Sequence, residues 1–228
     1  GMITYSSNAN TDYLIHLLGM ESINNRIDQL DLQQHEDVYP IVSALFISQH
    51  IQQTGMDEKE LIHELNEMPI ADYRSIAINL SEQMRTGELN VHDTVFDLSP
   101  ALQRVWSDRL IGASANDYGK LLAIIANDKL PKVAANTLRD IMEWPMQLNE
   151  ENHKRFTHIG SKGGSTLFVL NNAMYAENLN GDQYELVLLT DELNWIKRLL
   201  LSNNRKSFES KLLNQKEYRV KVQKELSE

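Results

Sequence analysis

The hydrophobic period of the chain changes once, near Trp144-Pro145, and this change limits the folds that the sequence can adopt. Before it, apolar residues recur at three- and four-residue spacing, which is typical of amphipathic helices. After it, alternating or continuous apolar runs indicate strands, with the hairpin signal Asn180-Gly181 between 167–177 and 184–190. The sequence therefore predicts a helical block followed by a meander of about three antiparallel strands, which is an α+β fold.

Capping residues divide the helical block into separate helices. Ser99-Pro100 is a typical N-cap and first-turn pair, and Gly19 and Gly87 are suited to end the helices before them. The expected helices cover 11–18, 23–30, a stretch from 40 toward 55, 58–68, 72–84, 101–110, 118–126 after a capping box at 114–117, and a segment opened by residue 131. After the strands, Asp191 is expected to cap a last helix, and Trp195 to pack in the core.

A length of 228 residues is enough for one domain with its own core, and no repeat or Pro/Gly/Ser-rich linker divides the chain. We expect a single domain over 1–228. Its parts would be a helical lobe at about 5–150, the sheet and a closing helix at about 155–202, and a charged tail at 203–228. The tail has the composition of a solvated helix, with disorder as the alternative.

Composition excludes several classes of function. The 22 basic residues against 32 acidic ones give a net charge of −10, which argues against nucleic acid and anionic membranes as partners. The lack of cysteine excludes disulfides, thiolate metal sites and cysteine nucleophiles. The seven histidines show no His-Glu-x-x-His or similar spacing, so neither a metal nor another cofactor is expected. No apolar run approaches the roughly 20 residues of a membrane span, and the chain begins without the features of a signal peptide.

The first candidate site is the stretch Lys162-Gly163-Gly164, followed by Ser165 and Thr166. Glycine weakens a strand unless something must come close to the backbone, and a lysine beside such an edge can bind an anion. The alternative is a β-bulge or a tight entry to a hairpin, with a solvated lysine. The second candidate is the polar cluster from Tyr5 to Asp12, for which helix capping is the alternative.

Taken together, Ser6-x-Asn8 before a helix and Lys162-Gly163-Gly164 on a strand resemble two of the three motifs of the penicillin-recognising serine hydrolases. This superfamily includes the class A β-lactamases and the penicillin-binding proteins. The resemblance covers nearly the whole chain, from Tyr5 to about Trp195. Supporting stretches are Gly112-Ala-Ser-Ala-Asn-Asp-Tyr, at the start of a helix, and Leu188-Leu-Thr-Asp after the last strand.

The resemblance implies a β-lactamase/transpeptidase-like fold that acts on β-lactams or D-alanyl peptides, substrates that carry a carboxylate. It implies that Ser6 relays a proton, that Asn8 contacts the substrate amide and that Lys162 holds the substrate carboxylate. The backbone N–H of Ser165 would supply half of an oxyanion hole. Gly163 and Gly164 would let a flat ligand lie against the strand.

One residue departs from the family pattern within this motif. Gly163 replaces the hydroxyl residue that the family often has there, so the substrate carboxylate would have one hydrogen-bonding group fewer. Ser165 or Thr166 could compensate for it.

The nucleophile of this superfamily lies in a Ser-x-x-Lys motif upstream of Ser-x-Asn, and no Ser-x-x-Lys occurs in the 228 residues. We therefore expect no acyl-enzyme chemistry from the chain as given. Either an N-terminal segment is missing, which we favour, or the protein is a non-catalytic binding or scaffold relative. The full-length protein of the first case would be exported or periplasmic. A sheet of the three C-terminal strands alone would expose an edge, and homodimers could form through it.

Overall fold

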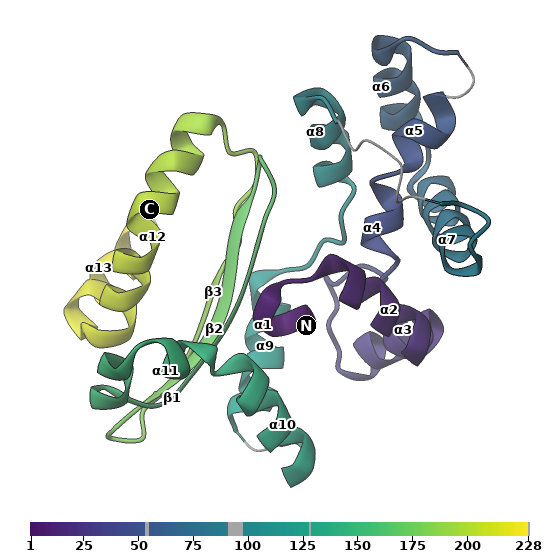
Figure 1. Cartoon of the computed structure of the whole chain (residues 1–228). Coiled ribbons are helices and arrows are strands. Elements are labelled where there is room, and N and C mark those ends of the chain that lie inside the picture. The colour runs from purple at the N-terminus through teal and green to yellow at the C-terminus, as the bar shows by residue number, and fades with distance from the viewer. Residues whose placement is uncertain (53–54, 91–97, 128, 228) are drawn as a thin grey trace. The chain divides into compact units, whose positions relative to one another are not determined.

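The computed structural model describes residues 1–52, 55–90, 98–127 and 129–227 (Figure 1). The described chain is mostly helical, with one three-stranded antiparallel sheet near the C-terminal end of the sequence, and this confirms the predicted α+β class. Its helices are α1 (Met2–Tyr5), α2 (Asn8–Leu18), α3 (Met20–Gln29), α4 (Ile41–Ala44), α5 (Ile47–Gln52), α6 (Glu58–Glu67), α7 (Ile70–Thr86), α8 (Pro100–Asp108), α9 (Ala115–Ala126), α10 (Lys132–Met142), α11 (Trp144–Leu148), the 3-10 helix η1 (Glu150–Lys154), α12 (Trp195–Asn214) and α13 (Lys216–Glu225).

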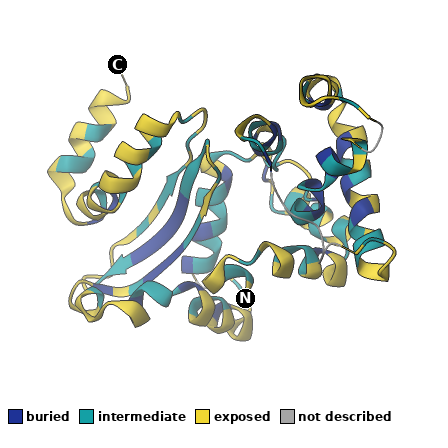
Figure 2. Ribbon diagram, turned by 45° about the horizontal axis from the view of Figure 1, so that its top comes forward, coloured by how far each residue is buried: buried dark blue, intermediate teal, exposed yellow. Residues whose placement is uncertain are grey.

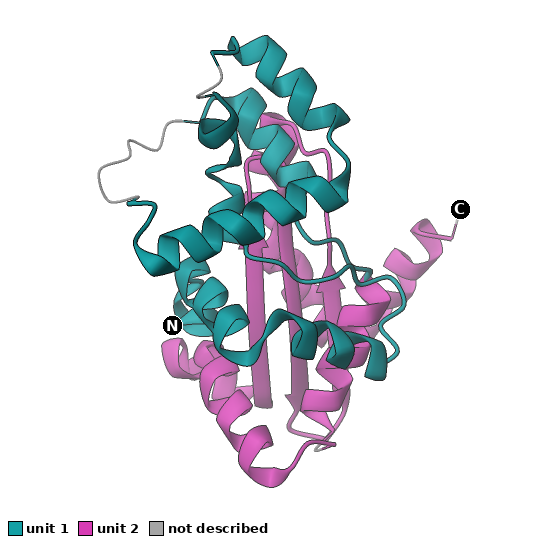
Figure 3. Cartoon of the chain, turned by 90° about the vertical axis from the view of Figure 1, so that its right-hand side faces the viewer, with its two compact units in different colours: residues 1–114 teal, residues 115–228 magenta. Residues whose placement is uncertain are grey.

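The chain divides into two compact units, residues 1–114 and residues 115–228 (Figure 3). The boundary lies between Ser114 and Ala115, well before the end of the helical lobe expected at about 150. Helices α9, α10 and α11 therefore belong to the same unit as the sheet, because they pack against its strands. The described residues of unit 1 form helices joined by loops, without a strand.

Unit 1 is built around a cluster of buried side chains, most of which come from α4 to α8. Leu61 of α6 and Ala77 of α7 are fully buried, and Tyr39 and Tyr73 are among the largest side chains enclosed. Arginines lie against both tyrosine rings: Arg74 is 5.3 Å from the ring centre of Tyr39. Apolar burial of this kind is the main stabilising contribution to a helical unit, since short isolated helices are marginal in water.

The ends of several helices agree with the sequence. Ser99 is the N-cap of α8, and its hydroxyl accepts a hydrogen bond from the backbone N–H of Leu102. Gly87 follows α7 in the left-handed conformation, with φ 78°. Asp57 and Glu60 form a capping box at the start of α6 that the sequence analysis did not identify.

The sheet has the strand order β1-β2-β3, with β1 at Phe156–Ser165, β2 at Leu170–Asn178 and β3 at Gln183–Leu188. Strand β2 is central and carries most of the buried positions, as the dark band in Figure 2 shows. The register of β1 against β2 shifts between Phe156 and His158 and is then continuous to Ser165. A one-residue bulge therefore lies at the start of β1, away from the glycines.

The two faces of the sheet are covered by different helices. Helix α10 contacts β1 and α9 contacts β2 and β3. On the other face, Leu213 of α12 packs with Ile159 of β1 and with Met174 and Ala176 of β2. The C-terminal helix expected over the sheet is thus present.

Three local predictions for this region need correction. Helix α12 begins at Trp195 with Asn194 as its N-cap, whereas Asp191 accepts a hydrogen bond from the N–H of the next residue, Glu192. Trp195, the first residue of α12, is 74% exposed and does not pack in the core. Residues 144–148 and 150–154 are helical and not extended, so the first strand begins only at Phe156.

The segment at 203–228 is helical over most of its length, as the solvated-helix prediction stated. It continues α12 to Asn214 and then forms α13. It is not solvated on every side, since Glu209 and Leu213 are buried in unit 2.

Candidate functional site

Lys162, Gly163 and Gly164 lie on β1, which pairs with β2 alone in the sheet formed by the described residues. Lys162 is half-buried, and its ammonium donates a hydrogen bond to the carbonyl oxygen of Gly163. Burial lowers the pKa of Lys162 because it disfavours the charged form. A carboxylate beside the ammonium would act in the opposite direction and favour the charge.

The structure does not support the alternative explanation of the two glycines as a bulge. The β1–β2 register is continuous through Gly163 and Gly164, and neither residue has a positive φ. A Cβ added at Gly164 would have no heavy atom of the described chain within 4 Å, and one at Gly163 would make ordinary contacts at 3.4 Å or more. Neither the backbone conformation nor internal packing therefore requires glycine at these positions.

Gly160, on the same strand, provides the contrast. A Cβ at this position would lie 2.4 Å from ring atoms of Tyr175, so internal packing alone demands glycine there. Nothing in the sequence distinguishes Gly160, and only the β1–β2 register, in which Gly160 faces Tyr175, reveals its role.

Ser165 and Thr166 lie at the end of β1 and in the turn that follows. Ser165 is exposed and pairs with Leu170 of β2. The hydroxyl of Thr166 accepts a hydrogen bond of 3.0 Å from the N–H of Phe168, and its carbonyl accepts one of 3.0 Å from Nε of Arg198. Thr166 thus stabilises the β1–β2 turn and joins it to α12.

A polar cluster on the α9 and α10 side of the sheet was not predicted. Oε1 of Glu143, at the end of α10, accepts a hydrogen bond from the hydroxyl of Tyr175 at 3.1 Å and lies 2.9 Å from Nδ1 of His158. Burial, followed by the charge of Glu143, raises the pKa of Tyr175. His158, Gly160 and Lys162 alternate along β1 and share this face of the sheet.

Ser6 and Asn8 belong to unit 1. Ser6 ends α1 in the left-handed conformation, with φ 51° and ψ 40°, which is uncommon for a residue other than glycine. Ser7 is the N-cap of α2, its hydroxyl accepting from the N–H of Asn10 at 3.3 Å, and Asn8 is the first residue of that helix. The expected capping role therefore falls on Ser7, and Ser6 and Asn8 are both exposed.

The two groups of predicted site residues belong to different compact units. Ser6 and Asn8 are part of unit 1, and the five residues from Lys162 to Thr166 are part of unit 2. Their convergence on one cleft stays a prediction.

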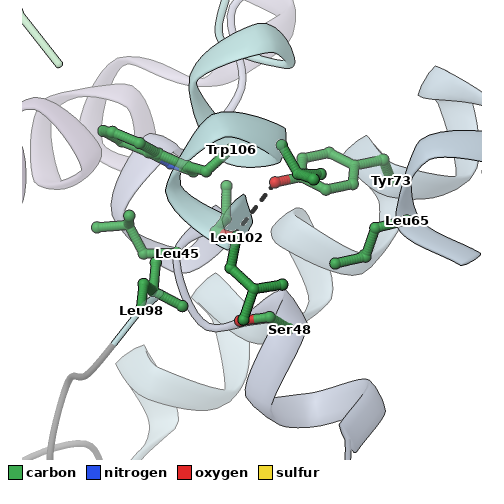
Figure 4. Close-up of a pocket in the computed structure, with 9 residues that line it drawn as sticks. Leu45, Ser48, Leu65, Tyr73, Leu98, Leu102 and Trp106 are labelled. Atoms are coloured by element: carbon green, nitrogen blue, oxygen red, sulfur yellow. Dashed lines mark hydrogen bonds between the residues drawn. The ribbon is translucent and has the colours of Figure 1, made fainter. Parts of the chain in front are cut away.

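Unit 1 also contains a small cavity of about 10 Å³, between helices α4 to α8 (Figure 4). Its wall is mostly apolar and includes Leu65, Tyr73 and Trp106, and the buried hydroxyl of Ser48 beside it has no hydrogen-bond partner among the described residues. A space of this size holds about one water molecule. It is therefore too small to be a substrate site.

Two features are absent from the residues that the structure describes. No group of three or more His, Cys, Asp or Glu side chains among them is arranged to hold a metal ion. None of their helices is both long enough and apolar enough to cross a membrane.

No protein-family model matches the chain, and no curated protein matches it significantly.

Proposed function

We propose that unit 2 carries the carboxylate-binding strand of a penicillin-recognising serine hydrolase, with a β-lactamase/transpeptidase-like fold. The observation that supports this most is the pair Gly163 and Gly164. Neither residue is required by the backbone conformation or by packing within the described chain, and a partly buried lysine precedes them. Close approach of an outside group to the strand explains such glycines.

In this proposal Lys162 binds the substrate carboxylate by a charge-assisted hydrogen bond. The backbone N–H of Ser165 stabilises an oxyanion, Ser6 relays a proton and Asn8 contacts the substrate amide. The substrate is a β-lactam or a D-alanyl peptide, and the protein is exported to reach it. These roles follow from the resemblance of the two motifs to the family.

A second candidate function is non-catalytic binding or scaffolding by a protein that keeps this fold. The absence of a Ser-x-x-Lys motif from the 228 residues favours it. Acyl transfer needs a serine with a base in hydrogen-bond reach, so the chain as given should bind a penicillin without forming a covalent adduct.

Binding and acylation can be measured separately on the same sample. Titration with benzylpenicillin should shift the amide signals of residues 162–166, and mass spectrometry should show no added mass. Lys162→Ala should weaken binding about tenfold or more, since a hydrogen bond to a charged group contributes ~1.5–3 kcal/mol.

The exposed Lys206→Ala is the matched control and should bind as the wild type does. Failure of the wild type to bind would contradict the proposed function. A stable adduct would instead contradict the absence of a nucleophile, and peptide mapping would then identify the reacting serine.

A further inference from the structure

A chain of buried polar side chains joins α12 to the strand that carries Lys162. The hydroxyl of Ser161 donates to Oδ1 of Asn172 at 2.9 Å, and Nδ2 of Asn172 donates to Oε1 of Glu209 at 2.9 Å. Ser161, Asn172 and Glu209 are only 6%, 7% and 7% exposed. Buried polar groups normally need partners, and this chain of hydrogen bonds supplies them across three elements.

The same chain reaches the backbone beside the glycines. Asn172 is the register partner of Gly163, and a Cβ at Gly163 would lie 3.5 Å from Oδ1 of Asn172. Arg205 of α12 donates through Nη1 to the carbonyl of Asn171 at 3.3 Å, and its Nε lies 3.7 Å from Oε1 of Glu209. The Asn172 amide therefore lies on the face of the sheet beside Gly163, and it is hydrogen-bonded to Glu209 of α12.

Glu209 is the hydrogen-bond partner of the Asn172 amide on α12. Its Oε1 accepts from the NH₂ group of Asn172, which leaves the amide oxygen of Asn172 to accept from the hydroxyl of Ser161. A buried carboxylate is costly, and an apolar residue would pack against a sheet without that cost. Its presence beside Asn172 of β2 therefore indicates a role beyond packing.

We propose that Glu209 is a positioning residue for the anion-binding strand. Through Asn172 and Ser161 it fixes the position and orientation of the backbone at Lys162, Gly163 and Gly164. This inference rests on the function proposed for that strand, and adds to it the residue on α12 that holds the strand in its binding geometry.

The direct test compares Glu209→Ala and Glu209→Gln with Glu217→Gln, which removes the same charge from an exposed position on α13. The readouts are the amide chemical shifts of residues 162–165 without ligand and the Kd of benzylpenicillin. Glu209→Ala should shift these amides and weaken binding about tenfold, because small displacements of binding groups are costly. Glu209→Gln keeps an acceptor for Asn172 and should have a smaller effect, and Glu217→Gln should have none.

A swap of the two side chains tests the mechanism even if Glu209→Ala fails to fold. Asn172→Asp alone places two carboxylates together and should displace the strand. In the double variant Asn172→Asp/Glu209→Gln, the introduced glutamine amide on α12 can donate to the introduced carboxylate on β2, while Ser161 still donates to that carboxylate. In the double variant, the amide chemical shifts of residues 162–165 should therefore return to their wild-type values. The Kd should lie within about threefold of the wild type, as expected for directly coupled residues.

The outcomes separate the two proposals. If the wild type binds and Glu209→Ala keeps both its amide shifts and its Kd, the positioning role is wrong and the proposed function stands. If the double variant is no better than Asn172→Asp, the positioning role is also wrong. If the wild type does not bind benzylpenicillin, the proposed function fails, and unchanged amide shifts in Glu209→Ala would overturn the positioning role as well.

Discussion

Gly160 shows how much a single residue of β1 depends on the neighbouring strand. Gly160→Ala places a Cβ 2.4 Å from the ring of Tyr175, so the ring or the strand must move. Overpacking of this kind should lower the free energy of unfolding by ~1–3 kcal/mol. Gly164→Ala, in open space on the same strand, is the matched control and should change stability little. Chemical denaturation of both variants tests this, and equal losses of stability would contradict the packing argument.

Buried tyrosines should make the protein sensitive to alkali. Burial raises the pKa of Tyr39 to about 12, whereas an unfolded tyrosine titrates near ~10. The folded state therefore holds the proton more tightly, so this contribution to stability is complete below pH ~10 and is lost as pH rises toward ~12. The loss is up to about 1.4 kcal/mol for each pH unit and each such tyrosine.

Thermal denaturation between pH 9 and 11.5 provides the measurement. Tyr39→Phe should reduce the slope of stability against pH, and Tyr5→Phe, at a position 82% exposed, should not. Equal slopes in the wild type and Tyr39→Phe would show that the phenol of Tyr39 is not the group responsible.

At the scale of the element, Asp12 connects two helices. Its two carboxylate oxygens accept hydrogen bonds of 2.9 Å from the N–H groups of Ile41 and Val42, at the start of α4. A helix of four residues has few other ways to satisfy these donors. Asp12→Ala should therefore destabilise unit 1 by ~1–3 kcal/mol, and Asp12→Asn, which keeps one acceptor, by less. Urea denaturation followed by tryptophan fluorescence measures both, and equal effects would contradict the capping role.

The elements also show what could be predicted from the sequence. Caps next to the helix they begin, such as Ser99, were predicted correctly because the signal is local. Asp12 was noticed only as part of a polar cluster, because its partners are 29 and 30 residues away. The hairpin predicted at Asn180-Gly181 exists, and Gly181 has a positive φ of 83°. Its loop is longer than the two predicted residues and spans 179–182. The side chain of Asn178 accepts hydrogen bonds from the N–H groups of Asn180 and Asp182 in this loop.

The candidate site likewise has one part that the sequence predicts and one part that it does not. Lys162-Gly163-Gly164 was placed on a strand because lysine and glycine beside β-like runs form a local pattern. Glu209, by contrast, lies in a charged segment that the sequence indicates as solvated, 37 residues after Asn172. Only the packing of α12 on the sheet gives it a buried partner, and tertiary contacts of this kind leave no local signal.

At the scale of the whole molecule, the boundary between the two units could not be predicted from the sequence either. Ser114 and Ala115 lie inside a stretch that indicates the start of a helix, and no change in composition marks the division. Each unit nevertheless has its own buried cluster, one around Leu61 and the other around Ile159. Domain boundaries are usually predicted from linkers, and this chain divides without one.

One of the two edge strands of the sheet, β3, leads to the last prediction. In the described residues β3 pairs only with β2, and none of its six positions is fully buried. Unpaired N–H and C=O groups on such an edge can pair with a second copy of the chain, so we expect reversible homodimers through β3. Hydrogen exchange of the β3 amides should slow as protein concentration rises, while the amides of β2, paired on both sides, serve as the internal reference. Sedimentation equilibrium should show the same dimer, and concentration-independent exchange together with a monomeric mass would rule out association through this edge.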